Sequence, residues 1–144
     1  MELQELYYKT IREHSLHPRN YMELEKTPGV LEKENVSCGD RIYLLVQFSP
    51  EETLQKIAFE LKGCSLSTAS ASMMTEIVKN KKKQDIQAIC QEVLETMEGK
   101  NPPTTLDSYH DLAVLKAVLP YPVRLKCAAF PWHALMDQIR PAFF

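Results

Sequence analysis

The chain has 144 residues, of which 44% are hydrophobic and 25% are charged, and its formal net charge at pH 7 is -2. These values are those of an ordinary globular protein, and they provide no broad positive field for binding nucleic acid. No run of about 18 apolar residues occurs, so no membrane-spanning helix is expected. The first residues do not resemble an export signal, so we expect a cytoplasmic protein with its four cysteines reduced.

The N-terminal half contains one predicted helix and three predicted strands. Apolar side chains recur at helical spacing over residues 3–14, and Pro18 ends this helix because the residue before a proline is pushed out of the helical region. Residues 29–36 form a weak extended stretch, interpreted as a short edge strand. Apolar and polar side chains alternate in residues 41–48 and again in residues 53–62, and the short polar connection between these runs predicts an antiparallel pair.

Helical patterns follow in the C-terminal half. Residues 65–79 are rich in Ala, Ser and Met and predict a helix that packs closely against its neighbours. Residues 86–97 carry an apolar stripe at helical spacing and predict another helix. Between these two helices, residues 79–83 are interpreted as a solvated basic turn, with contact to an acidic partner as the alternative.

Capping residues and prolines set the expected boundaries of the last elements. A short helix is expected to start at residues 107–108, and residues 120–122 are expected to form a stiff extended link. A proline is tolerated among the first four residues of a helix, whose N–H groups lack helical partners. Pro131 therefore predicts that the final helix begins near Ala128, with Cys127 at its N-cap.

Together these elements predict one α+β domain over residues 1–144, with a small antiparallel sheet of about three strands packed against helices. The presence of only four glycines argues against a sandwich or barrel built from many tight turns. Cys90 and His14 lie on apolar helical stripes, so we interpret them as packed residues and not as ligands.

The other three cysteines occur where predicted elements meet. Cys38 precedes the first strong strand, Cys64 lies where a strand ends and a helix begins, and Cys127 is expected at the start of the final helix. Asp40 follows Cys38 by two residues. Tetrahedral zinc accepts thiolate and carboxylate ligands together, and a helix N-terminus favours the thiolate form of cysteine. The spacings also leave open unrelated buried thiols, since free cysteine is among the most buried residue types.

Basic residues adjoin these candidate ligands in the sequence. Three thiolates, one carboxylate and a dication would leave a surplus of two negative charges. Lys62, Arg124 and Lys126 flank the candidates and are the residues that could offset this surplus.

Several longer motifs carry a resemblance to a known family. They are His17-Pro18-Arg19-Asn20, Cys38-Gly39-Asp40, the segment 62–76 that begins Lys62-Gly63-Cys64-Ser65, and Pro122-Val123-Arg124-Leu125-Lys126-Cys127-Ala128. With these motifs the chain resembles the IscU/NifU-type iron–sulfur cluster assembly scaffolds, and most closely their SufU branch. The resemblance implies a SufE/NifU-like fold and a pyridoxal-phosphate cysteine desulfurase of the SufS type as partner. It also implies a metal site made of Cys38, Asp40, Cys64 and Cys127.

Two features of the sequence favour the SufU branch. Lys126 stands where IscU-type scaffolds have a histidine, and the segment between Cys64 and Cys127 is longer than in those scaffolds. The resemblance then implies a zinc-dependent sulfurtransferase that takes persulfide sulfur from the desulfurase and relays it to downstream cluster-assembly proteins. One alternative is a scaffold that binds iron or an iron–sulfur cluster at the same residues. Another is a module in which zinc only holds the fold.

Sulfur transfer requires a reactive thiolate, and a thiolate held by zinc is a blunted nucleophile. One ligand is therefore expected to leave the metal. Cys38 lies in a predicted loop, whereas Cys64 and Cys127 are tied to helix starts, so Cys38 is the expected sulfur acceptor. Arg124 is expected to stabilise the released thiolate or the persulfide.

Overall fold

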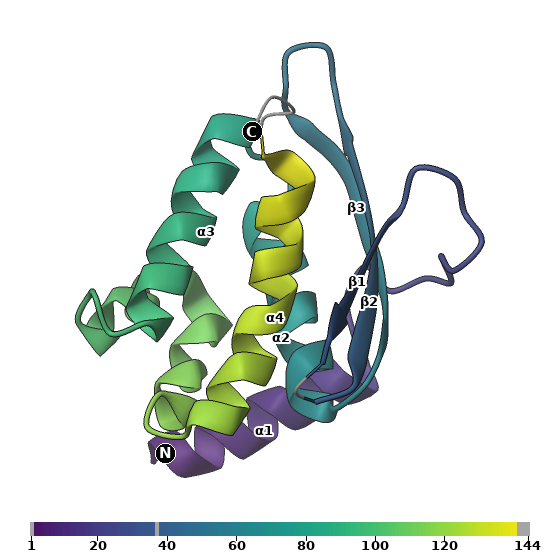
Figure 1. Ribbon diagram of the computed structural model, residues 1–144. Helices are drawn as coiled ribbons and strands as arrows, with labels where there is room; N and C mark the ends of the chain where they lie inside the picture. Colours follow the sequence, from purple (N-terminus) through teal and green to yellow (C-terminus); the bar gives the residue numbers. More distant parts are fainter. Residues whose placement is uncertain (1, 37, 141–144) are drawn as a thin grey trace.

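A three-stranded antiparallel sheet with helices packed on one of its faces forms the framework of the protein (Figure 1). The computed structural model describes residues 2–36 and 38–140. In chain order the elements are α1 (Leu3–Leu16), β1 (Leu31–Asn35), β2 (Asp40–Phe48), β3 (Leu54–Lys62), α2 (Ser65–Val78), α3 (Lys83–Met97), the 3-10 segment η1 (Pro103–Val118) and α4 (Pro122–Ile139). The α+β class expected from the sequence is confirmed.

The sheet has the order β1-β2-β3, with both neighbouring pairs antiparallel. Leu44 in the central strand lies opposite Leu31 on one side and Phe59 on the other, which fixes the register. Leu44 and Phe59 are fully buried in the core shared with the helices. The predicted strand pair and the weaker edge strand are therefore all present.

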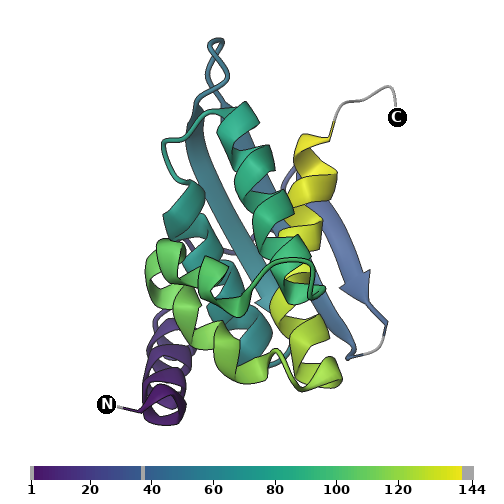
Figure 2. The same ribbon diagram turned by 90° about the vertical axis from the view of Figure 1, so that its left-hand side faces the viewer.

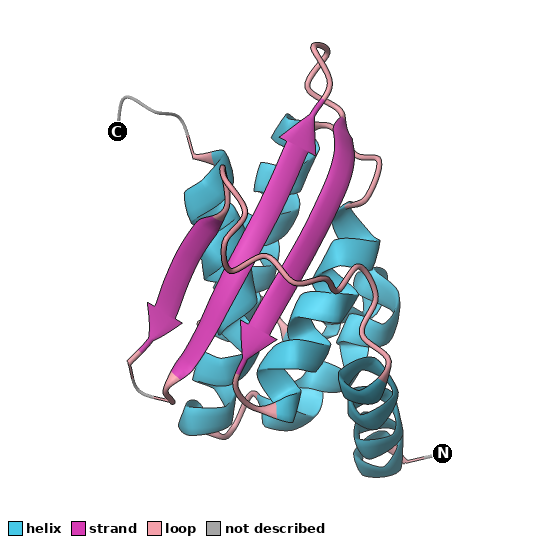
Figure 3. Ribbon diagram, turned by 90° about the vertical axis from the view of Figure 1, so that its right-hand side faces the viewer, coloured by secondary structure: helices cyan, strands magenta, loops and turns pink. Residues whose placement is uncertain are grey.

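The opposite face of the sheet is also covered, by the segment between α1 and β1 (Figure 3). Leu24 of this segment is buried with Tyr43, Leu45 and Ala58 in a second apolar cluster. The nearly buried carboxylate of Glu60 accepts the backbone N–H groups of Leu24 and its neighbour at 2.8 and 3.1 Å. Coverage of both faces explains why the apolar residues of β2 continue through positions that simple alternation would expose.

Small side chains let α2 pack closely under the sheet. Ala69, Ser70 and Ala71 are all buried, and the Ser70 hydroxyl donates to the carbonyl of Ala128 in α4 at 2.6 Å. Seen from the side, α3 and η1 lie on the outer side of this helical layer (Figure 2). Among the described residues, no helix is long and apolar enough to cross a membrane.

His14 ties α1 to the rest of the helical layer. Its Nδ1 lies 2.8 Å from the Ser72 hydroxyl of α2, and its Nε2 lies 2.9 Å from an Asp111 carboxylate oxygen in η1. The backbone N–H of Arg19 donates to the same Ser72 hydroxyl at 2.8 Å. The turn after α1 is thus fastened to α2, and His14 is a buried packing residue, as expected.

Cys90 is also a core residue, since its side chain is fully buried in the main apolar cluster. Burial raises the pKa of its thiol to about 12, so it stays protonated at neutral pH. The interpretation of Cys90 as a packed thiol is confirmed.

The predicted start of the final helix is wrong. Helix α4 begins at Pro122, so Pro131 lies inside it and Cys127 lies within the helix rather than at the N-cap. Pro122 occupies the first helical position, where the fixed φ of proline suits a helix and no N–H is needed. Pro131 leaves the carbonyl of Cys127 without its usual helical donor. The Ser67 hydroxyl of α2 lies 3.2 Å from that carbonyl, so a neighbouring helix offers it a polar contact.

The elements just before α4 also differ from the expectation. Segment η1 starts at Pro103 instead of residues 107–108, because two consecutive prolines begin it and Leu106 is fully buried in the core. Its backbone is interrupted at Tyr109 and His110, where His110 has a φ of 54°. The expected extended link over residues 120–122 shrinks to the N-cap Tyr121, because Pro122 is already helical.

Candidate metal and sulfur site

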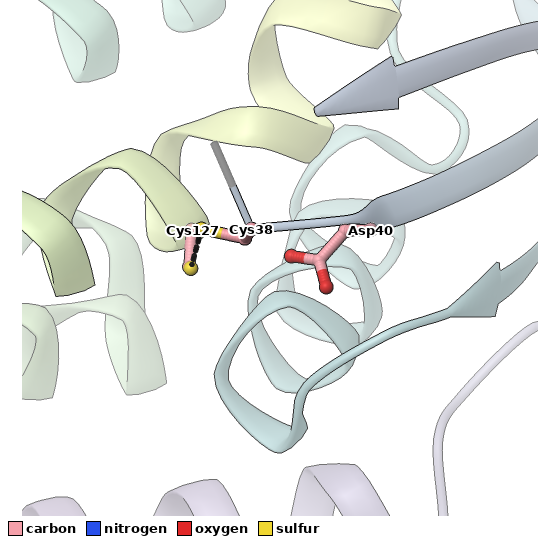
Figure 4. A group of neighbouring side chains, drawn as sticks. All are labelled: Cys38, Asp40 and Cys127. Atoms are coloured by element: carbon pink, nitrogen blue, oxygen red, sulfur yellow. Dashed lines mark hydrogen bonds between the residues drawn. The ribbon is translucent and has the colours of Figure 1, made fainter. Parts of the chain in front are cut away.

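The candidate residues come from separate elements that meet at one end of the sheet. Cys38 lies in the connection from β1 to β2, Asp40 begins β2, Cys64 caps α2, and Cys127 lies within α4. Figure 4 shows Cys38 and Cys127 side by side, with the Asp40 carboxylate close to the start of α2.

A tight backbone turn presents Cys38. The carbonyl of Asn35 accepts the N–H groups of Cys38 and Gly39 at 3.2 and 2.8 Å. Gly39 has a φ of 75°, a conformation that glycine adopts without steric cost. Cys38 itself is half-buried. It therefore sits on a connecting loop, as the sequence predicted, with part of its surface open.

Asp40 is 1% exposed, and its carboxylate lies against the N-terminus of α2. One oxygen accepts the backbone N–H of Cys64 at 3.1 Å, and the other accepts the hydroxyl of Ser67 at 2.6 Å. A negative charge is stabilised there by the free N–H groups and the dipole of the helix. Buried in this way, Asp40 is held in place by α2 as well as by its own strand.

Cys64 occupies the N-cap of α2, as expected. Its sulfur accepts the backbone N–H of Ser67 at 3.4 Å, and it lies 3.2 Å from the Ser67 hydroxyl and 3.9 Å from an Asp40 oxygen. The N-cap position places this sulfur against the free N–H groups of the first helical turn. Cys64 is also the exposed member of the set.

Cys127 is the buried member of the set, at 7% exposure, and its sulfur lies 2.9 Å from the sulfur of Cys38. Burial, the hydrogen bond with Cys38 and the nearby charge of Cys64 raise the pKa of the Cys127 thiol. Either of the two thiols could be the donor in this contact.

The geometry suits a metal ion. The ligand atoms of Cys38, Asp40 and Cys127 all lie within 4.8 Å of one another. Tetrahedral zinc with sulfur and oxygen ligands separates them by roughly 3.3–3.8 Å. The sulfur of Cys64 lies 3.9 Å from an Asp40 oxygen but outside this group, so it would have to move closer, and the two close sulfurs slightly apart, for all four residues to bind one ion. The donor set could thus hold a metal ion, and the unrelated-thiol alternative loses its basis.

The basic residues near the site behave differently from one another. Lys62 donates to Glu25 at 2.8 Å, so its charge is already paired on the outer face of the sheet. The suggestion that Lys62 offsets ligand charge is therefore wrong. Arg124 is exposed, lies over the ring of Tyr121 and forms no ion pair within the described part of the chain. Lys126 points to another region, a groove of about 610 Å³ that also contains Val36 and Phe130.

Two supporting residues were not identified as functional from the sequence. Ser67 is fully buried and contacts Asp40, the sulfur of Cys64 and the carbonyl of Cys127. Gly63 leaves the room that Asp40 fills. Tyr7 of α1 is buried, which raises the pKa of its phenol, while the charge of Arg124 lowers it and that of Cys64 raises it further. Tyr7 itself is a member of the main apolar core.

Comparisons with known proteins identify the family of the chain. Residues 6–128 match the family model of the NifU-like N terminal domain. The chain is 34% identical over 139 residues to an iron–sulfur cluster assembly scaffold protein IscU of Streptococcus pyogenes serotype M1, covering 96% of this chain and 86% of that protein. It is 35% identical over 133 residues to the zinc-dependent sulfurtransferase SufU of Bacillus subtilis (strain 168), covering 92% of this chain and 88% of that protein.

A solved structure shares the fold over nearly the whole length. It is a SufU described as an iron–sulfur cluster assembly scaffold protein for the SUF system, from Fervidobacterium islandicum AW-1. The TM-score is 0.82 at 27% identity, with 95% of this chain and 98% of that chain covered. From the family match, these relatives and this structure we conclude that the chain belongs to the IscU/NifU-type family of iron–sulfur cluster assembly proteins, with support for its SufU branch.

Proposed function

We propose that the protein is a zinc-dependent sulfur acceptor. It takes persulfide sulfur from a pyridoxal-phosphate cysteine desulfurase of the SufS type and relays it to downstream proteins that assemble iron–sulfur clusters. The observation that carries this proposal is the convergence of Cys38, Asp40 and Cys127 within 4.8 Å, with Cys38 on a loop. Similarity to the zinc-dependent sulfurtransferase from Bacillus subtilis supports the same function.

Zinc fits this donor set, and Cys38, Asp40, Cys64 and Cys127 are the residues that would hold it. When bound, Zn²⁺ would keep the cysteines as thiolates at neutral pH and moderate their nucleophilicity. Asp40 and Cys64 are fixed by α2, and Cys127 is fixed by α4. Cys38 has no such helical constraint, so we propose it as the sulfur acceptor.

The transfer is a thiol exchange. The Cys38 thiolate attacks the outer sulfur of the donor persulfide, a sulfur–sulfur bond forms on Cys38, and the donor cysteine leaves as a thiolate. Arg124 lies one helical turn before Cys127 and forms no ion pair with any described residue, so its charge is available to the anionic persulfide. We propose that Arg124 stabilises this anion.

Anaerobic desulfurase turnover with and without the protein tests the proposal, with persulfide located on each cysteine by mass spectrometry. We expect stimulation by the natural chain, loss of stimulation in Cys38→Ala, and retention in Cys90→Ala, which removes a buried thiol outside the site. Unchanged stimulation by Cys38→Ala would reject Cys38 as the acceptor. Persulfide found first on the exposed Cys64 would assign the role to that residue.

The scaffold function is the second candidate. It is favoured by the Streptococcus pyogenes relative, an iron–sulfur cluster assembly scaffold protein that is 34% identical over 96% of this chain. The same sulfur and carboxylate ligands would then hold iron or a cluster. A colourless protein with one bound zinc supports sulfur transfer, whereas a brown protein with stable iron and sulfide supports the scaffold. Zinc with only a structural role requires that Cys38→Ala lowers stability and leaves desulfurase turnover unchanged.

A further inference from the structure

We infer that Cys127 is a resolving thiol that releases sulfide from a persulfide on Cys38. The inference rests on the proposed function, which supplies the persulfide, and adds a reductive activity to it. In this activity the chain converts the transferred sulfur into free sulfide without an external electron donor at that step. The product on the protein is a Cys38–Cys127 disulfide.

The contact between the two sulfurs carries this inference. Their separation of 2.9 Å leaves no room for another atom between them. A disulfide needs a separation of about 2.05 Å, so the sulfurs must approach by less than 1 Å. Cys127 is fixed in α4, whereas Cys38 lies on a loop that contains Gly39 at positive φ. The loop is therefore the part that closes the remaining gap.

The position of Cys127 also selects which sulfur it attacks. A persulfide has an inner sulfur, belonging to Cys38, and an outer transferred sulfur. Attack on the outer sulfur would only pass it to Cys127, whereas attack on the inner sulfur expels it as sulfide. The contact is with the inner sulfur. Since Cys127 is buried and Cys38 is half-buried, the open side of Cys38 is available to the departing sulfide.

Atoms and electrons balance in this step. The Cys127 thiol and the anionic persulfide of Cys38 react to give the Cys38–Cys127 disulfide and HS⁻. The sulfur of Cys127 bonds to that of Cys38, the bond to the outer sulfur breaks, and the thiol proton leaves with the sulfide. The outer sulfur is reduced by two electrons and the two cysteines are oxidised together. A dithiol reductant then reopens the disulfide for another cycle.

Cys64 is less suited to the resolving role. Its sulfur accepts a backbone N–H of its own helix and lies outside the group of ligand atoms within 4.8 Å. A metal ion at the site would hold the sulfur of Cys127 as well, so we expect sulfide release from the Cys38 persulfide only in the chain without bound metal. Comparing the metal-bound chain with the metal-free chain is therefore a second part of the test.

The experiment loads the full chain anaerobically with limiting inorganic polysulfide, which bypasses the desulfurase. The chain is tested as purified, with its metal content measured, and after treatment with a chelator. Persulfide and disulfide are followed by mass spectrometry of non-reduced peptides, and sulfide by a colorimetric assay. We expect the Cys38 persulfide to disappear at the rate at which sulfide and the Cys38–Cys127 disulfide appear, in equal amounts. Bound zinc should slow the loss of the persulfide and the appearance of both sulfide and disulfide.

Variants separate the role of Cys127 from that of any nearby thiol. In Cys127→Ser and Cys127→Ala, the Cys38 persulfide should persist, and no sulfide should appear, over the time in which the natural chain releases its sulfide. In the matched Cys90→Ala, which removes a buried thiol outside the site, release should continue with the same disulfide. Circular dichroism checks the fold of each variant. If chelation unfolds the chain, Asp40→Ala removes a non-sulfur ligand, leaves every sulfur in place and serves as the metal-depleted arm.

The result that overturns the inference is a Cys38 persulfide that persists in the folded, metal-free chain, or sulfide release that continues without Cys127. A disulfide between Cys38 and Cys64 would also overturn it. Failure of a desulfurase to load any cysteine would instead reject the proposed function, and the polysulfide experiment would still decide the role of Cys127.

Discussion

Gly63 lies directly against the carboxylate of Asp40. A Cβ atom added at position 63 would stand 2.1 Å from the Asp40 Oδ1 and 2.9 Å from its Cβ, far inside van der Waals contact. Asp40 is 1% exposed and hydrogen-bonded to the start of α2, so it has little room to withdraw. The approach of these two residues is what allows β2 to place a carboxylate beside the cysteines of the candidate metal site.

Gly63→Ala should therefore displace Asp40 and weaken metal binding. We expect the zinc affinity to fall at least about tenfold, because outer contacts that orient a ligand typically affect affinity by that factor or more. Competition with a chromophoric chelator measures the affinity. Ser65→Ala, at a neighbouring exposed position, should leave it unchanged. An unaltered affinity in Gly63→Ala would show that Asp40 is not a ligand.

Ser67→Ala should destabilise the fold and also weaken the metal site. The change removes the hydroxyl that Asp40 accepts at 2.6 Å and that lies 3.2 Å from the Cys127 carbonyl. Leaving such buried acceptors without a donor costs about 1–3 kcal/mol in the free energy of unfolding. Urea unfolding measures this loss, and chelator competition measures the metal affinity.

Ser70→Ala is the matched comparison for Ser67→Ala. Its hydroxyl is equally buried and donates to the carbonyl of Ala128 at 2.6 Å, but it contacts none of the candidate ligands. We expect a similar loss of stability with no change in zinc affinity. Equal effects of the two variants on zinc affinity would contradict a specific role for Ser67.

The sequence predicts the order and type of the main elements because their periodic patterns reflect real burial. The strands around Leu44 and Phe59 are examples, since both residues lie on the face that the helices cover. Local patterns do not contain tertiary hydrogen bonds. The sequence pattern therefore does not reveal the start of α4, because the polar group nearest the carbonyl that Pro131 leaves free is Ser67, far away in the chain.

The candidate site likewise has features that local sequence patterns reveal and features that only tertiary contacts create. Cys38, Cys64 and Cys127 are found through their motifs, but their spacing alone does not place them together. The pairing of Lys62 with Glu25 and the support of Asp40 by Ser67 depend on contacts between distant segments. Such contacts arise only once the sheet and α2 have packed, so single-sequence patterns do not reveal them.

Arg124→Ala should slow the loading of sulfur onto Cys38 without removing the metal. Arg124 is exposed and no described residue forms an ion pair with it, so its loss should leave the fold and the zinc content intact. We expect the Cys38 persulfide to appear several-fold more slowly when desulfurase reactions are quenched at successive times and analysed by mass spectrometry. Arg124→Lys should restore part of the rate because it keeps the charge. Arg12→Ala, an exposed cation on α1, serves as the control.

High pH should destabilise the fold through Cys90. Burial raises the pKa of its thiol to about 12 in the folded chain, above the value in the unfolded chain. Unfolding then releases a proton at pH values between these two pKa values, so the stabilising contribution is complete below the unfolded pKa and is lost as the pH rises through the folded one. In this window the free energy of unfolding should fall by up to about 1.4 kcal/mol per pH unit more in the natural chain than in Cys90→Ala. Urea unfolding of both chains at pH 8 and pH 10.5 measures the difference, because other groups that titrate are common to both. Equal slopes for the two chains would mean that Cys90 ionises without unfolding, and that its helix opens locally to water.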